Sequence, residues 1–379
     1  MKPTTISQAF STLTDPRMDR CKRHPLINII TISICAIIGG CDDFCSIEEY
    51  GKSKQEWFAE FLDLPHGIPS HDTFCDVLNR LNPNEFAQAF THWVSQLGKL
   101  KDDIVALDGK VMRGTLDKAN GNSAIHLVSA WSVNNSLCFG QVKVADKSNE
   151  ITAIPLLLEL LDIEQATITT DAMGCQYKIA DSIVAKEGHY VFALKGNQGE
   201  CHDDIKLFLD TQLSTGFAST PHSQDNSVDG EHGRIEQRTV WLSHDVDWLH
   251  QRHPQWQSIN AIAVVESKRQ VGDAPASYER RYYITSHQDK DAAFIAHAIR
   301  SHWHIENKLH WQLDVSFNED YNRLRSGYGA ENIAMMNKIA LNLLKNETSV
   351  TVGIKHKRLK AGWDNDYMMK VLTVGFTSV

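Results

Sequence analysis

The 379-residue chain contains few of the features that would assign it at once to a secreted or redox-active class. No two of its eight cysteines are spaced as CxxC, and five of them fall irregularly within the first 75 residues. In a chain of this size such spacing argues against a disulfide framework. We therefore expect small buried thiols in a reducing compartment.

The sequence also lacks a long hydrophobic run. The most apolar stretch, residues 25–38, follows several basic residues and superficially resembles a signal peptide. However, those basic residues lie far from Met1, and Asn28, Thr31 and Ser33 interrupt the stretch. It is also shorter than the roughly 20 residues that span a bilayer. A buried helix and no membrane association are therefore expected.

An excess of positive charge is absent as well. The chain has 38 Lys and Arg against 47 Asp and Glu, a net charge of −9, which argues against a simple basic nucleic-acid coat protein. The charge is uneven: residues 41–63 carry −5 and residues 199–231 carry −6, whereas residues 1–30 carry +3 and residues 321–379 carry +5. Basic residues of the last window include Lys355, Lys357, Arg358 and Lys360. If a nucleic acid binds, it should contact the basic ends and avoid both acidic windows.

Hydrophobic periodicity divides the chain into segments. Residues 1–98 are typical of helices, with Ser70 as an expected N-cap. Alternating or short apolar runs then predict strands over residues 104–107, 125–133, 137–144, 166–170 and 189–194. Helices are expected between these strands over residues 151–161 (capped by Ser148), 176–187 and 201–213.

The later part of the chain changes character twice. Residues 215–233 are rich in small and polar residues and predict an exposed loop. Strands follow over residues 235–242, 259–265 and 281–285, and helices resume at Lys290. A three-stranded meander followed by β/α units indicates an α/β protein with a ribonuclease-H-like core and a mixed sheet. The expected divisions are a helical domain (1–98), the first part of the core (99–214), a β-rich insertion (215–288) and the helical end of the core (289–379).

Three acidic residues occupy positions suited to catalysis. Asp108 and Asp171 each follow a predicted strand, where functional groups of α/β sheets gather, although an Asp after a strand can simply begin a turn. Glu306 is expected on an apolar helix face shared with Ile299, Trp303, His310 and Leu313. Burial there would be costly unless the carboxylate is ion-paired or binds metal. Rival acids downstream are Asp314, Glu319 and Asp320.

Carboxylates that converge in space repel one another, and divalent cations offset that repulsion. Mg²⁺ prefers oxygen ligands, and two such ions can stabilise the attacking and leaving oxygens of a phosphoryl displacement. His302, Glu306 and His310 are spaced at i, i+4 and i+8, which could suggest zinc. One helix cannot readily wrap all three around one ion, and HExxH is absent from the sequence.

Short stretches along nearly the whole chain carry a family resemblance through their order. They are residues 24–26 (HPL), 67–74 (GIPSHDTF), 107–110 (LDGK), 147–155 (KSNEITAIP), 170–176 (TDAMGCQ), 194–198 (LKGNQ), 232–236 (HGRIE), 300–320 and 340–345 (ALNLLK). The chain resembles bacterial insertion-sequence transposases of the DDE class, especially the branch of H-repeat-associated proteins of Rhs elements.

The resemblance implies a ribonuclease-H-like core in which Asp108, Asp171 and Glu306 form a catalytic triad that binds Mg²⁺, with Mn²⁺ as a substitute. It implies cleavage at the ends of a transposon and transfer of the freed 3′-hydroxyl into target DNA. The partner would be double-stranded DNA bound by a homo-oligomer, in the cytoplasm and on the nucleoid. The alternative is a domesticated or inactive transposase-derived protein that binds DNA without catalysis.

The sequence departs from the family pattern around Glu306. Many related transposases have Tyr, Arg and Lys where this chain has Ile299, His302 and Leu313, whereas Trp303 and Ile305 match. Arg300 and Lys308 are candidates to substitute for the missing cations. The full set of expected DNA contacts is Lys110, Arg113, Lys195, Asn197, Gln198, Arg300, His302 and Lys308. For each of these residues, a solvated surface position is the alternative.

Overall fold

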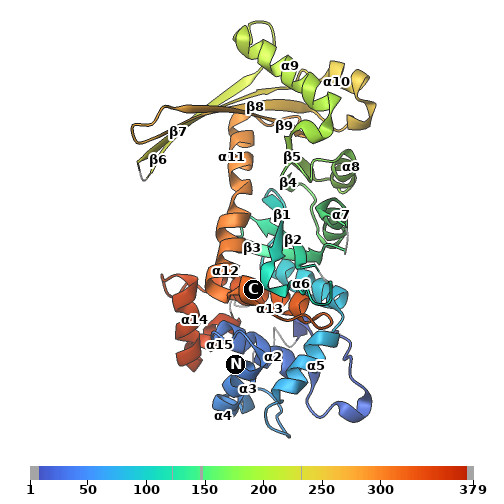
Figure 1. The fold of residues 1–379 in the computed structure, drawn as a ribbon, viewed down its shortest axis with the longest axis vertical. Helices are drawn as coiled ribbons and strands as arrows, with labels where there is room; N and C mark the ends of the chain where they lie inside the picture. The colour runs from blue at the N-terminus through green and yellow to red at the C-terminus, as the bar shows by residue number, and fades with distance from the viewer. Residues whose placement is uncertain (1–7, 122, 146–147, 232, 374–379) are drawn as a thin grey trace.

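The fold is taken from a computed structural model of the chain. It describes residues 8–121, 123–145, 148–231 and 233–373. Lys147 and His232, which belong to two of the stretches quoted above, lie outside the described residues. Figure 1 shows an elongated molecule, with the helices of both chain ends at one pole, a sheet through the middle and a strand-rich ribbon at the other pole.

The first part of the chain is helical, as predicted. Its helices are α2 (Leu26–Ile38), α3 (Phe44–Ser53), α4 (Gln55–Ala59), α5 (His71–Arg80) and α6 (Pro83–Leu97), after the 3₁₀ turn η1 (Asp19–Cys21). Ser70 caps α5 by accepting a hydrogen bond from the Thr73 amide. The apolar stretch is the buried helix α2. Among the described residues, no helix is long and apolar enough to cross a bilayer.

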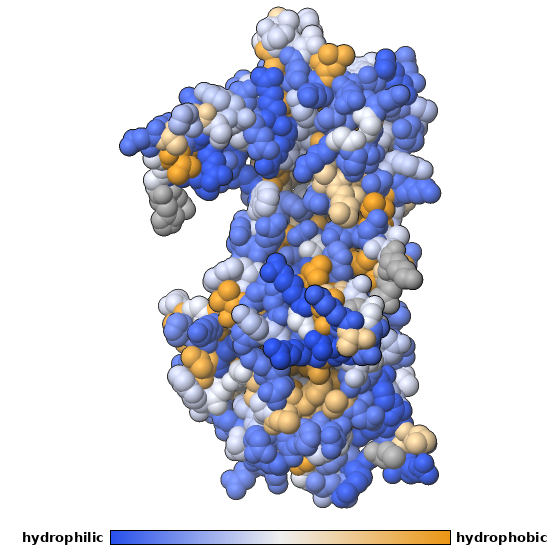
Figure 2. Space-filling view, viewed as in Figure 1, coloured by the Kyte–Doolittle hydropathy of each residue, from blue (hydrophilic) through white to orange (hydrophobic). Residues whose placement is uncertain are grey.

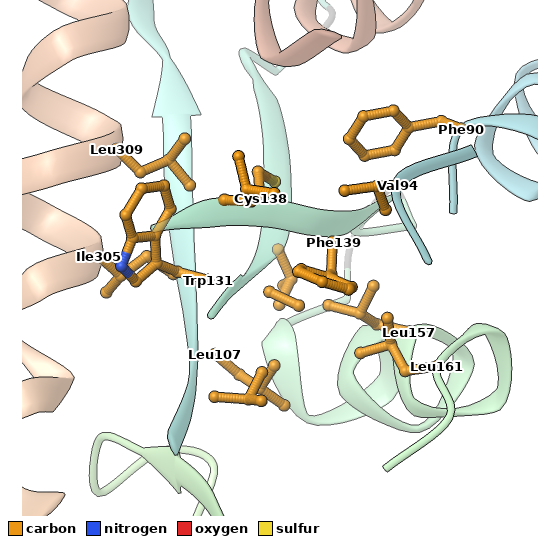
Figure 3. Close-up of a cluster of buried hydrophobic side chains, with 14 of the residues drawn as sticks. Phe90, Val94, Leu107, Trp131, Cys138, Phe139, Leu157, Leu161, Ile305 and Leu309 are labelled. Atoms are coloured by element: carbon orange, nitrogen blue, oxygen red, sulfur yellow. The ribbon is translucent and has the colours of Figure 1, made fainter. Parts of the chain in front are cut away.

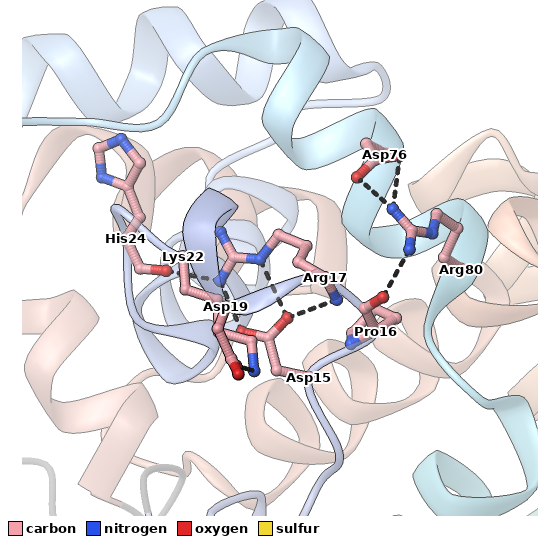
Figure 4. A network of polar contacts seen from close by, with 8 residues as sticks. All are labelled: Asp15, Pro16, Arg17, Asp19, Lys22, His24, Asp76 and Arg80. Carbon is pink, nitrogen blue, oxygen red and sulfur yellow. Dashed lines mark hydrogen bonds and ion pairs between the residues drawn. The ribbon is translucent and has the colours of Figure 1, made fainter.

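Several basic residues near the N-terminus are held by internal contacts (Figure 4). Arg17 is buried, and its Nη2 lies 2.7 Å from Asp15 Oδ2 and 2.6 Å from the carbonyl of His24. Arg80 of α5 donates to the carbonyl of Pro16 at 2.6 Å, which ties this segment to the helical domain. Arg17 therefore does not contribute to the basic surface that the charge of residues 1–30 suggests.

The sheet has the strand order β3-β2-β1-β4-β5-β9-β8-β7-β6. The antiparallel meander consists of β1 (Ile104–Met112), β2 (Ile125–Ser132) and β3 (Leu137–Lys143), while β4 (Thr167–Thr170) and β5 (His189–Leu194) run parallel to β1. The mixed α/β class is confirmed. The predicted end of the first strand at Leu107 is wrong, because pairing with β2 continues through Met112 and places Asp108 inside the strand.

Strands β6 (Ser223–Glu231), β7 (Arg234–Ser243), β8 (Ala261–Val271) and β9 (Ser277–Thr285) continue the same sheet as an antiparallel ribbon. The exposed loop predicted over residues 215–233 is therefore wrong for its second half. Polar composition misled that prediction, because β6 is the edge strand beside β7 and the side chains of residues 223–230 are at most half-buried.

The remaining helices cover the sheet and close the molecule. They are α7 (Glu150–Leu160), α8 (Tyr177–Ala185), α9 (Glu200–Ser214), α10 (Asp247–Arg252), α11 (Ala292–His302), α12 (Trp311–Phe317), α13 (Gly329–Asn346), α14 (Ile354–Trp363) and α15 (Asn365–Thr373). The cap of α7 is Asn149, which accepts from the Ile151 amide, and not Ser148 as predicted. Between α11 and α12 lies the π-helical segment η5 (Ile305–His310).

The main core joins both faces of the meander to helices far apart in the sequence. Ile305 and Leu309 of η5 lie beside Trp131, and Leu157 of α7 lies beside Phe139 (Figure 3). Helix α13 packs against α2, so the two ends of the chain share this core. The strand that carries Asp108 is thus held rigidly by packing on both sides.

Candidate active site

Asp108 and Asp171 lie next to each other because their strands are adjacent and parallel. In the register of β1 and β4, Leu107 pairs with Thr170, and each aspartate is the next residue along its chain. Both aspartates fall on the same side as Thr169, whose hydroxyl lies 3.0 Å from Nδ1 of His302 at the end of α11. The first two residues of the predicted triad are therefore together, facing α11 and η5.

Glu306 comes to the same place from the π-helical segment. Its charge is one of the carboxylate charges that raise the pKa of Asp108, so it lies near the two aspartates. The expectation that Glu306 belongs to a buried apolar face is wrong. In the wider π turn, Ile305 and Leu309 are buried and Glu306 is exposed, as is Trp303 just before the turn.

Burial and carboxylate repulsion both act against ionisation of Asp108 in this acidic centre. The pKa of Asp108 is raised to about 7, first by burial and then by the charges of Glu150, Glu306 and Asp171, against a backbone hydrogen bond from Gly109 that lowers it. The Asp108 side chain is only 19% exposed, so water screens these charges incompletely. Such a strongly shifted carboxyl among other acids is typical of a functional site.

Glu150 is the acidic neighbour that sequence reasoning missed. It is the first residue of α7, its carboxylate lies 2.9 Å from Nε2 of His126 on β2, and it has a larger effect on Asp108 than either Asp171 or Glu306. Gly109 makes room for this pair, because a Cβ there would lie 2.1 Å from Glu150 Oε1. The sequence signals were the position of Glu150 at a helix start, which reads equally well as dipole stabilisation, and its place in the family-like stretch 147–155.

Two histidines, at the end of α11 and the end of η5, lie beside the same acidic centre. Nδ1 of His310 lies 3.5 Å from Asp108 Oδ2, and burial lowers the pKa of His310 to about 3. Burial likewise lowers the pKa of His302 to about 4, although Asp171 acts in the opposite direction. Both rings are therefore neutral near pH 7. His302, predicted as a DNA contact, is instead engaged with Thr169 inside the protein.

The donor set is suited to a hard divalent cation, since carboxylate oxygens are the preferred ligands of Mg²⁺. Besides burial, the charges of Glu150, Glu306 and Asp171 raise the pKa of Asp108, and a bound cation would offset that repulsion. In the part of the chain that the structure describes, no group of three His, Cys, Asp or Glu side chains is already close enough to hold a metal ion. The residues therefore fit the ion in chemistry but are not gathered around one position.

Lys110 and Arg113, both predicted to contact DNA, have different surroundings. Lys110 Nζ lies 2.6 Å from Asp314, 3.2 Å from Glu319 and 3.3 Å from Asp320, and its side chain is only 10% exposed. The contacts with Asp314 and Glu319 are ion pairs without hydrogen-bond geometry. The side chain of Arg113 is 85% exposed, so of the two it is the one available to a phosphate.

The segment after β5 supports the loop that follows Asp171. Asn197 donates to the carbonyl of Ala172 at 2.8 Å, and Gln198 donates to that of Cys175 at 2.6 Å. Asp171 itself accepts from the amides of the same loop. Asn197 and Gln198, predicted as DNA contacts, are placed to position this loop, while Lys195 beside them is exposed.

The remaining predicted contacts lie on the helical segment that carries Glu306. Arg300 is 47% exposed in its side chain and pairs with Asp229 of β6 at 2.8 Å, and Lys308 is half-buried. The rival acids Asp314, Glu319 and Asp320 surround Lys110 and not Asp108.

Comparison with known families identifies the family of the chain. Residues 99–343 match the family described as Transposase DDE domain, and residues 7–94 match the one described as DDE_Tnp_1-associated. The chain belongs to the DDE transposase family. The family resemblance noted in the sequence is thereby confirmed. Asp108, Asp171 and Glu306 all fall within the part that matches the transposase domain.

Similar proteins extend over nearly the whole chain. Putative transposase YncI of Escherichia coli O157:H7 is 38% identical over 98% of this chain and 95% of its own length. H repeat-associated putative transposase YhhI of Escherichia coli strain K12 is 37% identical over 98% of both chains. A short match, 33% identical over 15% of this chain, is to Inactive transposase YbfQ of strain K12.

Proposed function

We propose that the chain is a DNA transposase whose ribonuclease-H-like core cleaves transposon ends and joins them to target DNA. The observation that carries this proposal is the convergence of Asp108, Asp171 and Glu306 from two adjacent strands and a packed helical segment. The strand order of the core, with an antiparallel meander followed by two parallel strands, supports the assignment of the core.

Asp108, Asp171 and Glu306 are the proposed ligands of Mg²⁺ or Mn²⁺. When bound, the ions would stabilise the attacking and leaving oxygens during phosphoryl displacement. Asp108 must lose its proton to serve as a ligand, and its pKa of about 7 makes that inexpensive near neutrality. Asn197 and Gln198 hold the loop that follows Asp171. His310 lies beside Asp108 and is neutral, so it would not repel a cation bound there.

The proposed DNA contacts are the exposed cations Arg113, Lys195 and Arg300, together with the half-buried Lys308. The partner is double-stranded DNA, and a homo-oligomer acting on paired ends would bring two such centres together. The predicted divisions at residues 98, 214 and 288 are proposed as the boundaries of the helical domain, the core and its insertion.

The test is cleavage of a supercoiled plasmid that carries the DNA flanking the gene, with Mg²⁺ present. The wild type should nick or linearise the plasmid at the element's ends, and Asp108→Ala and Asp171→Ala should reduce cleavage to background. Robust cleavage by either variant would refute the triad. DNA binding without any cleavage by the wild type would favour an inactive, transposase-derived DNA-binding protein, which the departures at Ile299, His302 and Leu313 keep as the second candidate.

A further inference from the structure

The side of the ribbon that faces α11 carries a row of arginines. Val240 and Leu242 of β7 pack against α11, so Arg238 and Arg234, at alternate positions along the same strand, lie on that side too. Arg281 of β9 lies on the same side, since it alternates with Tyr283 of this apolar cluster. The apolar cluster thus gives way to positive side chains toward the tip of the ribbon.

These arginines are held by carboxylates. Nη1 of Arg238 and Nη2 of Arg300 both lie 2.8 Å from one oxygen of Asp229, on the edge strand β6. Arg238 also pairs with Glu236 at 2.6 Å, and Arg281 with Glu279 at 2.8 Å.

Asp229 is an ionised clamp between the ribbon and α11. Burial acts to raise its pKa, but Arg300 and Arg238 lower it overall. The side chains of Asp229 and Arg300 are 38% and 47% exposed, so water and ions reach both. Because β6 is the edge strand of the described sheet, beside β7, the Asp229 side chain can turn outward without disturbing a further strand.

Resting on the proposed function, we propose that Arg238 and Arg300 form a binding site for one DNA backbone phosphate, and that Asp229 occupies this site until DNA displaces it. A phosphodiester carries one negative charge, as a carboxylate does, and guanidinium groups bind both with charge-assisted hydrogen bonds. When a DNA phosphate replaces the Asp229 carboxylate, the two arginines still face one negative charge.

The position suits a DNA contact close to the reaction. Arg300 lies on the helical segment that leads to Glu306. The ribbon projects beyond α11 in Figure 1, and the space-filling view shows the surface hollowed beneath it (Figure 2). A phosphate bound between Arg238 and Arg300 would place the duplex along this hollow. Asp229 then lowers the affinity for DNA by competing for the site.

The experiment measures binding of a fluorescein-labelled DNA duplex by the full chain as a function of salt. Asp229→Asn should tighten binding several-fold at low salt. The matched control is Glu266→Gln, which removes one negative charge from the opposite side of the same ribbon, where Glu266 pairs with Arg280 at 2.9 Å. Arg300→Gln should weaken binding and reduce the salt slope by about one, and Asp229→Asn combined with Arg300→Gln should show no gain.

An equal gain in Asp229→Asn and Glu266→Gln would overturn the proposal, because a general charge effect would then explain it. A full gain in the double variant would overturn it as well. Melting temperatures separate these results from misfolding. If the wild type binds and cleaves DNA but the two acid variants behave alike, this inference fails alone. If the wild type neither binds nor cleaves, the proposed function fails.

Discussion

Two residues on one face of β1, separated by a single residue, have opposite electrostatic surroundings. Asp108 has its pKa raised to about 7 by burial and by three other carboxylates. Lys110 is enclosed by Asp314, Glu319 and Asp320, and its positive charge offsets theirs. In the first set, the neighbouring acids repel the charge of Asp108, and this repulsion favours binding of a metal cation. The second is an internal ion-pair cluster that joins the strand to α12 and the segment after it.

The largest expected effect comes from breaking the compensated cluster. Lys110→Met should destabilise the protein by about 3–5 kcal/mol, because the Glu319 side chain is fully buried and loses its closest cation. Urea unfolding monitored by tryptophan fluorescence measures this. Arg113→Met, an exposed neighbour of the same cluster, is the control and should change stability by less than about 1 kcal/mol. Similar losses in both would show that Lys110 is not a structural cation.

The uncompensated centre should respond to pH in the opposite sense from a salt-bridged acid. The folded pKa of Asp108, about 7, lies above its ordinary value of 3.8, so its ionisation costs stability as pH rises through this interval. In the absence of divalent ions, Asp108→Asn should therefore match the wild type near pH 4. By pH 8 it should exceed the wild type by at most about 4 kcal/mol. Thermal unfolding profiles that stay parallel between pH 4 and pH 8 would contradict this.

A smaller effect is expected from Glu150, and it measures how much this residue contributes to the pKa of Asp108. Removing its charge with Glu150→Gln should lower the pKa of Asp108, since Glu150 is the strongest of the three carboxylates that raise it. Carboxyl ¹³C NMR titration measures the shift directly. His126→Gln should act in the same direction but more weakly, because His126 holds down the pKa of Glu150 and its loss favours the uncharged form of Glu150. An unmoved Asp108 in Glu150→Gln would mean that burial alone sets its pKa.

The smallest expected effect concerns the loop behind Asp171. Asn197→Ala removes the hydrogen bond to Ala172 and should cost about 1 kcal/mol in stability. If Asn197 positions the loop, cleavage should fall by more than binding of duplex DNA does. Lys195→Ala is the control, because its side chain is exposed and should affect binding more than cleavage. The reverse pattern would return Asn197 to the role of a DNA contact.

Much of this fold follows from local patterns in the chain. The meander, the two parallel strands and the cap at Ser70 could be predicted from alternation, turn residues and capping chemistry. The strand β6 could not, because an edge strand with polar residues on both faces has the composition of a loop. The π turn around Glu306 was equally invisible, since helical spacing assumes 3.6 residues per turn and the wider turn changes which side chains are buried.

The sequence by itself determined most of the helices and strands, the family and the three candidate acids. Only the tertiary structure decided which charges are free. Lys357 and Arg358, counted as part of a basic end, are buried against the carbonyls of Leu344 and Ile37. Asp229, counted as part of an acidic window, neutralises two arginines. Ion pairs form between residues far apart in the chain, so a local charge count cannot show which phosphates or metal ions a surface will attract.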